Sequence, residues 1–349
     1  MSSVKNPAAF TALKRSLEPK TMDLGLDQTG VDRFFVCSVA DSPTFDPTTW
    51  SMAIDGPAAA APTDVSLDDL RQLPQHDLDA WLECAGNGRR LYELVDGHTA
   101  PPIDADTQWM LGAMGMASWR GPRLRDVIAL ASPTDAMRWV APSGVDDDNI
   151  EHEAPKMCMP ADKALHPDTI VALEMNGEPL VAEHGAPARV VVPGWVGAYS
   201  VKWLGRIELS DVWVPSWRAD VYYQHRLPDG TALGPATEHP VKSCLALDWD
   251  APLPAGTQEI VGYARVSGQP IRSVDWSVDG SEWQPAELVG PNDDWTWSPF
   301  RFEWTATPGR HEIRTRATAA DGTTQPESTP YHPNTILWNA ITPHPVIIE

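Results

Sequence analysis

The last third of the chain alternates apolar and polar residues in short runs. These runs cover residues 260–266, 271–278, 300–305 and 311–318, and turn-forming pairs separate them at Asp279-Gly280, Pro308-Gly309 and Asp321-Gly322. A period of two places successive side chains on opposite faces of a strand, and Asp-Gly and Pro-Gly pairs favour tight turns. The pattern therefore predicts an all-β sandwich of immunoglobulin-like type.

The residues before about 240 mix helical and extended patterns. Residues 123–131 repeat apolar side chains at the spacing of an amphipathic helix. Ser66 precedes two aspartates, which favours the start of a short helix that Pro74 ends. A further short helix is predicted at 10–17, and apolar runs predict strands at 50–56, 78–82, 139–141 and 189–193 and the end of a strand at 34–36.

These patterns predict two domains. A mixed α/β (α+β) domain over residues 1–239 would hold the chemistry, and an immunoglobulin-like sandwich over 240–349 would follow it. A chain of 349 residues is long enough to give each domain its own core.

The net charge, the apolar runs and the cysteine spacing each exclude some classes of binding partner or site. A formal net charge of −22 argues against binding to nucleic acid or to an anionic membrane. No apolar run is long enough for a membrane-spanning helix, and the polar N-terminal residues favour a cytoplasmic location. The cysteines lack the spacing of zinc, iron–sulfur or haem c sites; they are Cys37, Cys84, Cys158 and Cys244.

The stretch with the most distinctive chemistry is Leu82-Glu83-Cys84-Ala85-Gly86-Asn87-Gly88-Arg89-Arg90. Small residues let the backbone pass close to a bulky ligand, and neighbouring arginines favour a thiolate at Cys84. A thiolate is a soft metal ligand, and arginine is suited to gripping oxyanions. The alternative is a buried structural cysteine before a turn.

This stretch resembles the molybdenum-binding loop of the sulfite oxidase family, in which a Cys-Ala-Gly-Asn-Arg-Arg run supplies the protein ligand of a molybdopterin-bound molybdenum. The similarity extends over nearly the whole chain. It continues through Trp109-Met110-Leu111-Gly112-Ala113, Trp119 to Leu124, Glu174 to Leu180, His184-Gly185, Arg189 to Gly194 and Gly197 to Leu204, and Val278 to Trp283 resembles the family's C-terminal dimerisation domain.

The resemblance implies a molybdenum–molybdopterin cofactor (Moco) with Cys84 as the metal ligand. It further implies that Arg89 binds the negative charge of the substrate, that Trp109 walls the pocket and that Tyr222 hydrogen-bonds an oxygen of the substrate or metal. Tyr223 is the near rival of Tyr222. The implied cofactor-binding residues include the phosphate clamp of His184, Arg189 and Lys202; the others are Phe35, Val36, Cys37, Ser38, Asp147, Ser200 and Val201.

The chain departs from the family at three places. Gly88 stands where the family usually has arginine, and Cys37 stands where the family has the arginine that follows the apolar pair Phe34-Phe35. A further family arginine belongs before Asn339, where the sequence offers no cation except His332. Cys37 is either a small core residue, a pocket-lining group or a second metal ligand, and the lost arginines predict that sulfite is a poor substrate.

The resulting interpretation is a molybdenum-dependent oxidoreductase that transfers an oxygen atom to or from a small oxyanion or oxide. Its expected partners are a separate electron-transfer partner and a second copy in a homodimer. Seven of the 16 tryptophans lie from Trp249 onward, which favours an aromatic-rich interface beside a small core. The alternatives are a reductase that runs in the nitrate-reductase-like direction, and a non-catalytic cofactor-binding or interaction protein.

Overall fold

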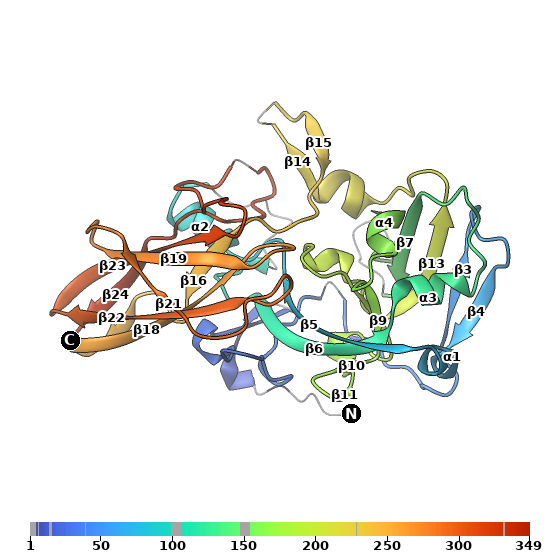
Figure 1. Ribbon diagram of the computed structural model, residues 1–349, viewed down its shortest axis with the longest axis horizontal. Helices are drawn as coiled ribbons and strands as arrows, with labels where there is room; N and C mark the ends of the chain where they lie inside the picture. Colours follow the sequence, from blue (N-terminus) through green and yellow to red (C-terminus); the bar gives the residue numbers. More distant parts are fainter. Residues whose placement is uncertain are drawn as a thin grey trace. The chain divides into compact units, whose positions relative to one another are not determined.

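The computed structural model describes residues 5, 7–13, 16–38, 40–98, 107–146, 154–227, 229–330 and 332–349. The described residues form two compact units (Figure 1). Unit 1 contains residues 36–79 and 117–237, and unit 2 contains the described part of 4–35 together with 80–116 and 238–349. The last boundary falls close to the predicted one at 239, but the grouping differs from a linear division because residues 80–116, which include Cys84, join the sandwich.

Unit 1 is built around a mixed sheet of five strands within the described residues, in the order β4-β3-β13-β7-β8. Strand β13 pairs parallel with β3 and antiparallel with β7. The bounds are β3 Ser51–Asp55, β4 Thr63–Ser66, β7 Trp139–Gly144, β8 Met159–Pro160 and β13 Leu204–Ser210.

The described residues of unit 1 form three short α-helices, and two of them match predictions. Helix α1 (Leu67–Gln72) begins with a capping box in which Ser66 and Asp69 bond each other's backbone N–H. Helix α3 (Leu124–Ala129) buries Leu124, Val127 and Ile128 on the predicted face. Helix α4 (Ala161–Ala164) follows β8.

The remaining strands that lie wholly in unit 1 are short, and two longer strands, β5 (Gln75–Glu83) and β6 (Met114–Pro122), lie partly in unit 1 and partly in unit 2. Strand β9 (Ile170–Ala172) pairs with β12 (Arg189–Val191), which confirms a buried strand at the predicted place. The others are β10 Glu174–Met175, β11 Glu178–Pro179, β14 Gln224–Arg226 and β15 Ala232–Pro235. The chain passes from unit 1 to unit 2 within β5 and returns within β6.

The sandwich of unit 2 consists of two sheets, and its strands fall where the alternating pattern predicts them. One sheet has the order β16-β18-β22-β21 and the other β17-β24-β23-β19-β20 (Figure 1). The bounds are β16 Lys242–Leu245, β17 Ala251–Leu253, β18 Gly256–Arg265, β19 Ile271–Val278, β20 Gln284–Pro285, β21 Glu287–Leu288, β22 Ser298–Ala306, β23 Gly309–Ala319 and β24 His344–Ile348.

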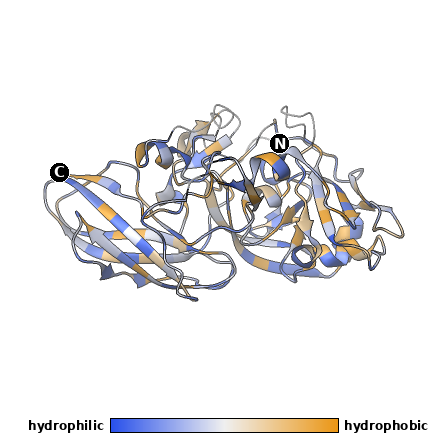
Figure 2. Ribbon diagram, turned by 90° about the horizontal axis from the view of Figure 1, so that it is seen from above, coloured by the Kyte–Doolittle hydropathy of each residue, from blue (hydrophilic) through white to orange (hydrophobic). Residues whose placement is uncertain are grey.

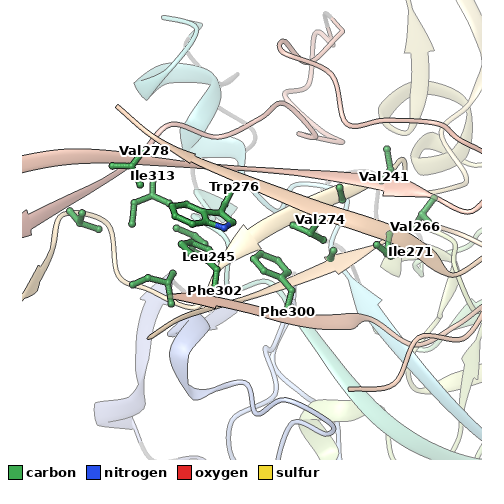
Figure 3. Packing of buried hydrophobic residues seen from close by; sticks show 14 of the residues in the cluster. Val241, Leu245, Val266, Ile271, Val274, Trp276, Val278, Phe300, Phe302 and Ile313 are labelled. Atoms are coloured by element: carbon green, nitrogen blue, oxygen red, sulfur yellow. The ribbon is translucent and has the colours of Figure 1, made fainter. Parts of the chain in front are cut away.

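Apolar side chains from both sheets fill the space between them (Figure 3). Trp276 of β19 stacks on Phe302 of β22 with ring centroids 4.4 Å apart. Orange and blue bands alternate along these strands in Figure 2, as expected for sheets with one buried and one solvated face. Burial of these apolar side chains away from water is the main stabilising contribution to this layer.

The seven tryptophans from Trp249 onward are all buried or half-buried within unit 2. Trp276, Trp297 and Trp338 are buried, and the other four are half-buried. Polar ion pairs lie on the sheets outside the core, including Arg316–Asp275 at 3.0 Å and Arg301–Glu287 at 2.9 Å. The homodimer stays a prediction.

The N-terminal residues of unit 2 correct two expectations. The helix predicted at 10–17 is wrong: β1 (Phe10–Leu13) pairs antiparallel with β2 (Ser16–Pro19). Pairing between strands overrides the helix-like spacing of the apolar residues. The strand end predicted at 34–36 is also wrong at Phe34, which lies in a turn closed by its N–H on Gly30 O at 2.9 Å.

A second apolar cluster joins the Cys84 segment to the sandwich within unit 2. Helix α2 (Arg89–Leu94) buries Leu91 and Tyr92 against Trp338 and Trp297. Tyr92 and Trp338 meet edge to face, with ring centroids 5.1 Å apart. The contacts explain why residues 80–116 group with the sandwich.

Across the described part of the chain, no helix combines the length and the apolar character needed to cross a membrane.

Candidate molybdenum-cofactor site

Cys84 follows the last residue of β5 and begins a tight loop in unit 2. Its N–H donates to Ala113 O at 2.9 Å, and its carbonyl accepts from Asn87 N at 2.9 Å. The cysteine is half-buried and forms no disulfide. Since its backbone is held on both sides, the side chain starts from a fixed position on a rigid strand end.

Asn87 fastens this loop to its neighbours. Its amide Nδ2 donates to Glu83 Oε1 at 3.0 Å and to Leu111 O at 3.3 Å. Its Oδ1 accepts from Ala113 N at 3.0 Å. The asparagine is buried, so it serves the shape of the loop rather than a ligand.

Glu83 lies directly before Cys84 and is the centre of a buried ion cluster that sequence reasoning missed. Its carboxylate accepts from Lys242 Nζ at 2.9 Å and from Arg265 Nε. Although burial by itself raises the pKa of Glu83, the charges of Arg265 and Lys242 lower it well below its usual range. One signal was available: Lys242 stands inside an apolar run, as Lys202 does.

Arg89 is the first residue of α2, and its side chain is buried. Its Nη1 donates to Thr107 O at 2.7 Å and also bonds the Thr107 hydroxyl. The guanidinium folds over Gly86, where a Cβ would lie 2.7 Å from Nη2. Glycine at 86 therefore makes room for the arginine, whose substrate-binding role stays a prediction.

Trp109 lies in unit 2 beside Phe35, and both are predicted site residues. Their rings meet edge to face with centroids 6.4 Å apart. Both side chains are buried, and among the described residues the Trp109 Nε1 donor has no hydrogen-bond partner. A buried donor without a partner is costly and marks a place where a ligand oxygen fits.

Arg189 is the clearest cofactor-binding candidate in unit 1. It is buried, its Nη1 donates to His184 O at 3.1 Å, and its Nη2 donates to Ser200 O at 2.8 Å. Its Nε has no hydrogen-bond partner among the described residues, which also provide it no ion pair. Burial lowers the pKa of Arg189.

Lys202 lies near this arginine and is half-buried. Its Nζ donates to Ser38 Oγ at 3.0 Å and to Glu183 O at 3.0 Å, and it stands 4.0 Å from the centroid of the Trp203 ring. Burial of the ammonium group and repulsion by Arg189 lower the pKa of Lys202 to about 7. A bound anion would favour the charged form of both cations.

The backbone around these cations is shaped by two predicted residues and one glycine. Ser200 Oγ accepts from Val192 N at 3.0 Å, and Val201 O accepts from Val190 N at 2.9 Å. Gly185 has φ +100°, and a Cβ there would lie 3.0 Å from Lys202 Cβ. His184 is buried immediately before this glycine.

Cys37 and Ser38 are half-buried, and Val36 is buried. Ser38 Oγ accepts a hydrogen bond from Lys202 directly, and Cys37 lies near enough that its ionised form would raise the pKa of the same lysine. The structure thus brings Cys37, Ser38 and Lys202 into one cluster of unit 1.

Two further predicted residues are less informative. Tyr222 ends a π-helical turn, η6 (Arg218–Tyr222), and is half-buried beside Trp217 with ring centroids 5.6 Å apart. Asp147 lies outside the described residues. Its neighbour Asp146 is buried, and its charge acts on Lys202.

These residues fit an anionic cofactor. Arg189 and Lys202 bond only neutral oxygen atoms among the described residues, and the buried Tyr199 hydroxyl also lacks a partner there. A buried cation such as Arg189 that bonds no carboxylate is costly unless an anion neutralises it. In unit 2, Cys84 is a half-buried cysteine outside any disulfide, and its thiolate would be a ligand of the soft type that molybdenum accepts.

Comparison with known proteins points to the same chemistry. The family model described as "Oxidoreductase molybdopterin binding domain" matches residues 39–217. Mitochondrial sulfite oxidase of Mus musculus is 32% identical over 326 residues, which cover 88% of this chain and 58% of that protein. The chain therefore spans little more than half the length of that relative.

Two further similarities extend the comparison. The NADH nitrate reductase of Ulva prolifera is 30% identical over 169 residues, which cover 45% of this chain and 18% of that protein. The crystal structure of the sulfane dehydrogenase SoxCD from Paracoccus pantotrophus superposes with a TM-score of 0.82 at 22% identity, covering 100% of this chain and 89% of that one. This last match confirms the fold class, a mixed α/β domain with a β-rich C-terminal part.

Proposed function

Because the chain belongs to the sulfite oxidase family and carries its molybdopterin-binding oxidoreductase domain, we propose that it catalyses two-electron oxygen-atom transfer on a small oxyanion or oxide. The observation that carries the proposal is the pair of cations in unit 1, Arg189 and Lys202, which bond only neutral oxygens among the described residues. A pterin phosphate is the anion that suits them, because arginine binds phosphate through parallel N–H donors.

We assign the following roles to the chain's residues. Cys84 binds the metal through its thiolate, while Arg189, Lys202 and His184 hold the pterin phosphate. When bound, the cofactor supplies the redox chemistry. Trp109 excludes water from the pocket and offers its Nε1–H to an oxygen, and the Tyr222 hydroxyl donates a hydrogen bond to an oxygen of the substrate or metal.

The substrate we propose is less charged or larger than sulfite. Cys37 is neutral in its protonated form and stands where the family has an arginine. His332 is buried, and its Nδ1 accepts a hydrogen bond from Asn334 N at 3.2 Å, so that nitrogen carries no proton. Neither position supplies the fixed positive charge that a dianion needs.

The reaction would need a separate electron-transfer partner, and we place the enzyme in the cytoplasm as a homodimer. The reducing direction is the second candidate, favoured by the similarity to a nitrate reductase over 45% of the chain. A non-catalytic cofactor-binding protein is the third outcome.

Metal and pterin analysis of the purified full-length protein tests the proposal, followed by assays in both directions. Sulfite, neutral sulfur compounds and amine or sulfur oxides would be screened with an artificial electron acceptor or donor. We expect bound molybdenum and pterin with oxidation of a weakly charged substrate. Protein that binds no molybdenum would contradict the proposal, and loaded protein inert in both directions would leave only the non-catalytic role.

A further inference from the structure

We propose that the buried cluster of Glu83, Lys242 and Arg265 positions the Cys84 loop, so that β16 and β18 of the sandwich are part of the cysteine site. The inference rests on the proposed role of Cys84 and assigns positioning roles to Lys242 and Arg265, which lie beyond the matched family domain because it ends at residue 217. It gives the sandwich a task beyond a subunit interface.

The contacts run from the sandwich to the loop in one step. Lys242 is the first residue of β16, and its Nζ donates both to Glu83 Oε1 at 2.9 Å and to Asn87 O at 3.2 Å. Arg265, the last residue of β18, bonds the other carboxylate oxygen of Glu83. The cluster therefore fixes the residue before Cys84 and the residue three places after it.

Burial restricts how far the three charged side chains can move. The side chains of Glu83, Lys242 and Arg265 are 1%, 2% and 3% exposed. Ions this deeply buried tolerate little displacement, because a lost partner leaves an uncompensated charge in a poorly solvated place. The Cys84 loop is bonded to this cluster, so the cluster also restrains the position of the loop.

The cluster sets two basic side chains against the carboxylate of Glu83. Burial lowers the pKa of Lys242 while the charge of Glu83 raises it, and burial and repulsion by Arg265 lower the pKa of His239 to about 3 and keep it neutral. His239 Nε2 donates to the carbonyl of Glu83 at 3.0 Å and so adds a further bond to the same residue. A cation held beside the metal ligand favours the reduced, more negative state of a bound metal.

Lys242→Met in the full-length protein is the discriminating variant. It removes the bond to Asn87 O but leaves Glu83 paired with Arg265, so the remaining charges balance. We expect backbone amides of residues 84–92 to exchange with solvent faster by on the order of 10- to 100-fold, the effect of losing one hydrogen bond from a charged group. In the metal-loaded protein the midpoint potential of the metal should fall.

Arg316→Met is the matched control. It also removes one cation of an ion pair in the sandwich, with Asp275 at 3.0 Å, but among the described residues no hydrogen bond or ion pair joins that pair to the Cys84 loop. We expect normal exchange at 84–92 and an unchanged potential in this variant. Should Lys242→Met fold poorly, Glu83→Gln/Lys242→Met/Arg265→Met, which leaves no uncompensated charge in the cluster, is measured in its place.

The outcomes separate this inference from the proposed function. Faster exchange confined to residues 84–92 together with a lower potential supports positioning by the cluster. Exchange at 84–92 equal to that of wild type, exchange raised equally throughout unit 2, or an unchanged potential would overturn it. If the wild-type protein binds no molybdenum, the proposed function fails, and the exchange measurement alone decides the positioning role.

Discussion

Gly88 and Trp338 are in such close contact that a side chain at residue 88 would collide with the indole. A Cβ on Gly88 would lie 2.8 Å from Trp338 Cβ and 2.9 Å from its Cγ, and the φ of Gly88 is +92°. Glycine at this place, where the family usually has arginine, is thus matched by a tryptophan that occupies the same space. The pair keeps the Cys84 loop against the sandwich.

Gly88→Arg should therefore destabilise the protein and disturb the loop. A non-glycine residue at this φ costs about 1–3 kcal/mol, and overpacking against Trp338 adds a comparable amount. Chemical denaturation measures the loss. Gly88→Arg/Trp338→Ala should lose less stability than the two single changes added together, because the collision is gone, and strict additivity would contradict the contact.

The neutral residue at position 37 predicts weak turnover of sulfite. Cys37→Arg should raise kcat/KM for sulfite by about 10-fold or more, since a hydrogen bond to a charged group contributes about 1.5–3 kcal/mol. Cys37→Met is the control for side-chain size and should give no gain. A wild-type kcat/KM for sulfite near 10⁶ M⁻¹s⁻¹, a value typical of efficient enzymes, would contradict the expectation.

Replacing Arg189 should reduce cofactor binding without reducing the stability of the cofactor-free protein. Arg189→Met should weaken pterin retention by about 10- to 100-fold, while the cofactor-free protein keeps its stability because a buried cation without an ion pair is removed. Arg206→Met is the control, since Arg206 pairs with Asp55 and Glu208 at 2.8 Å each and is more exposed. Equal pterin content in both variants would count against a phosphate role.

Glu18 predicts a pH dependence of stability. Burial raises its pKa to about 7, although its carboxylate accepts a hydrogen bond from Gly112 N at 2.9 Å. The folded state therefore binds the proton more tightly than the unfolded chain does. The resulting stability is complete below the model-peptide pKa of 4.5 and is lost as pH rises through about 7.

The shift corresponds to up to about 3 kcal/mol between pH 4 and pH 8, because one pKa unit is about 1.36 kcal/mol. Urea denaturation of wild type and Glu18→Gln at several pH values isolates this contribution from the other titrating groups. The difference in stability between the two proteins should change in favour of the variant as pH rises. A difference that does not vary with pH would contradict the assignment.

The sequence was most informative where a rule is local. The alternation of apolar and polar residues predicted the positions of the sandwich strands, and the capping pattern at Ser66 predicted the start of α1. A single cation inside an apolar run identified Arg189 and Lys202, because such a group needs a partner wherever it is buried. Each of these features is specified by residues that lie close to it in the sequence.

The misses come from contacts that the local pattern of apolar and polar residues does not specify, whether the partners are close in the sequence or far apart. The hairpin of β1 and β2 was mistaken for a helix because its apolar spacing suits both structures. The Glu83 cluster was overlooked because Lys242 lies 159 residues from its partner, although the rule applied to Lys202 also applies to Lys242. The restraint of Arg89 by Thr107 could not be read from the sequence either.

The most direct test of the account is the sulfur coordination of molybdenum in wild type and Cys84→Ser, measured by X-ray absorption. Serine preserves the size of the side chain but replaces a soft thiolate with a hard, poorly ionised hydroxyl. We predict bound molybdenum in the wild-type protein, one fewer sulfur ligand in the variant, and loss of turnover with the fold intact. Wild-type protein without molybdenum, or the same sulfur coordination in both proteins, would contradict the central claim that Cys84 is the metal ligand.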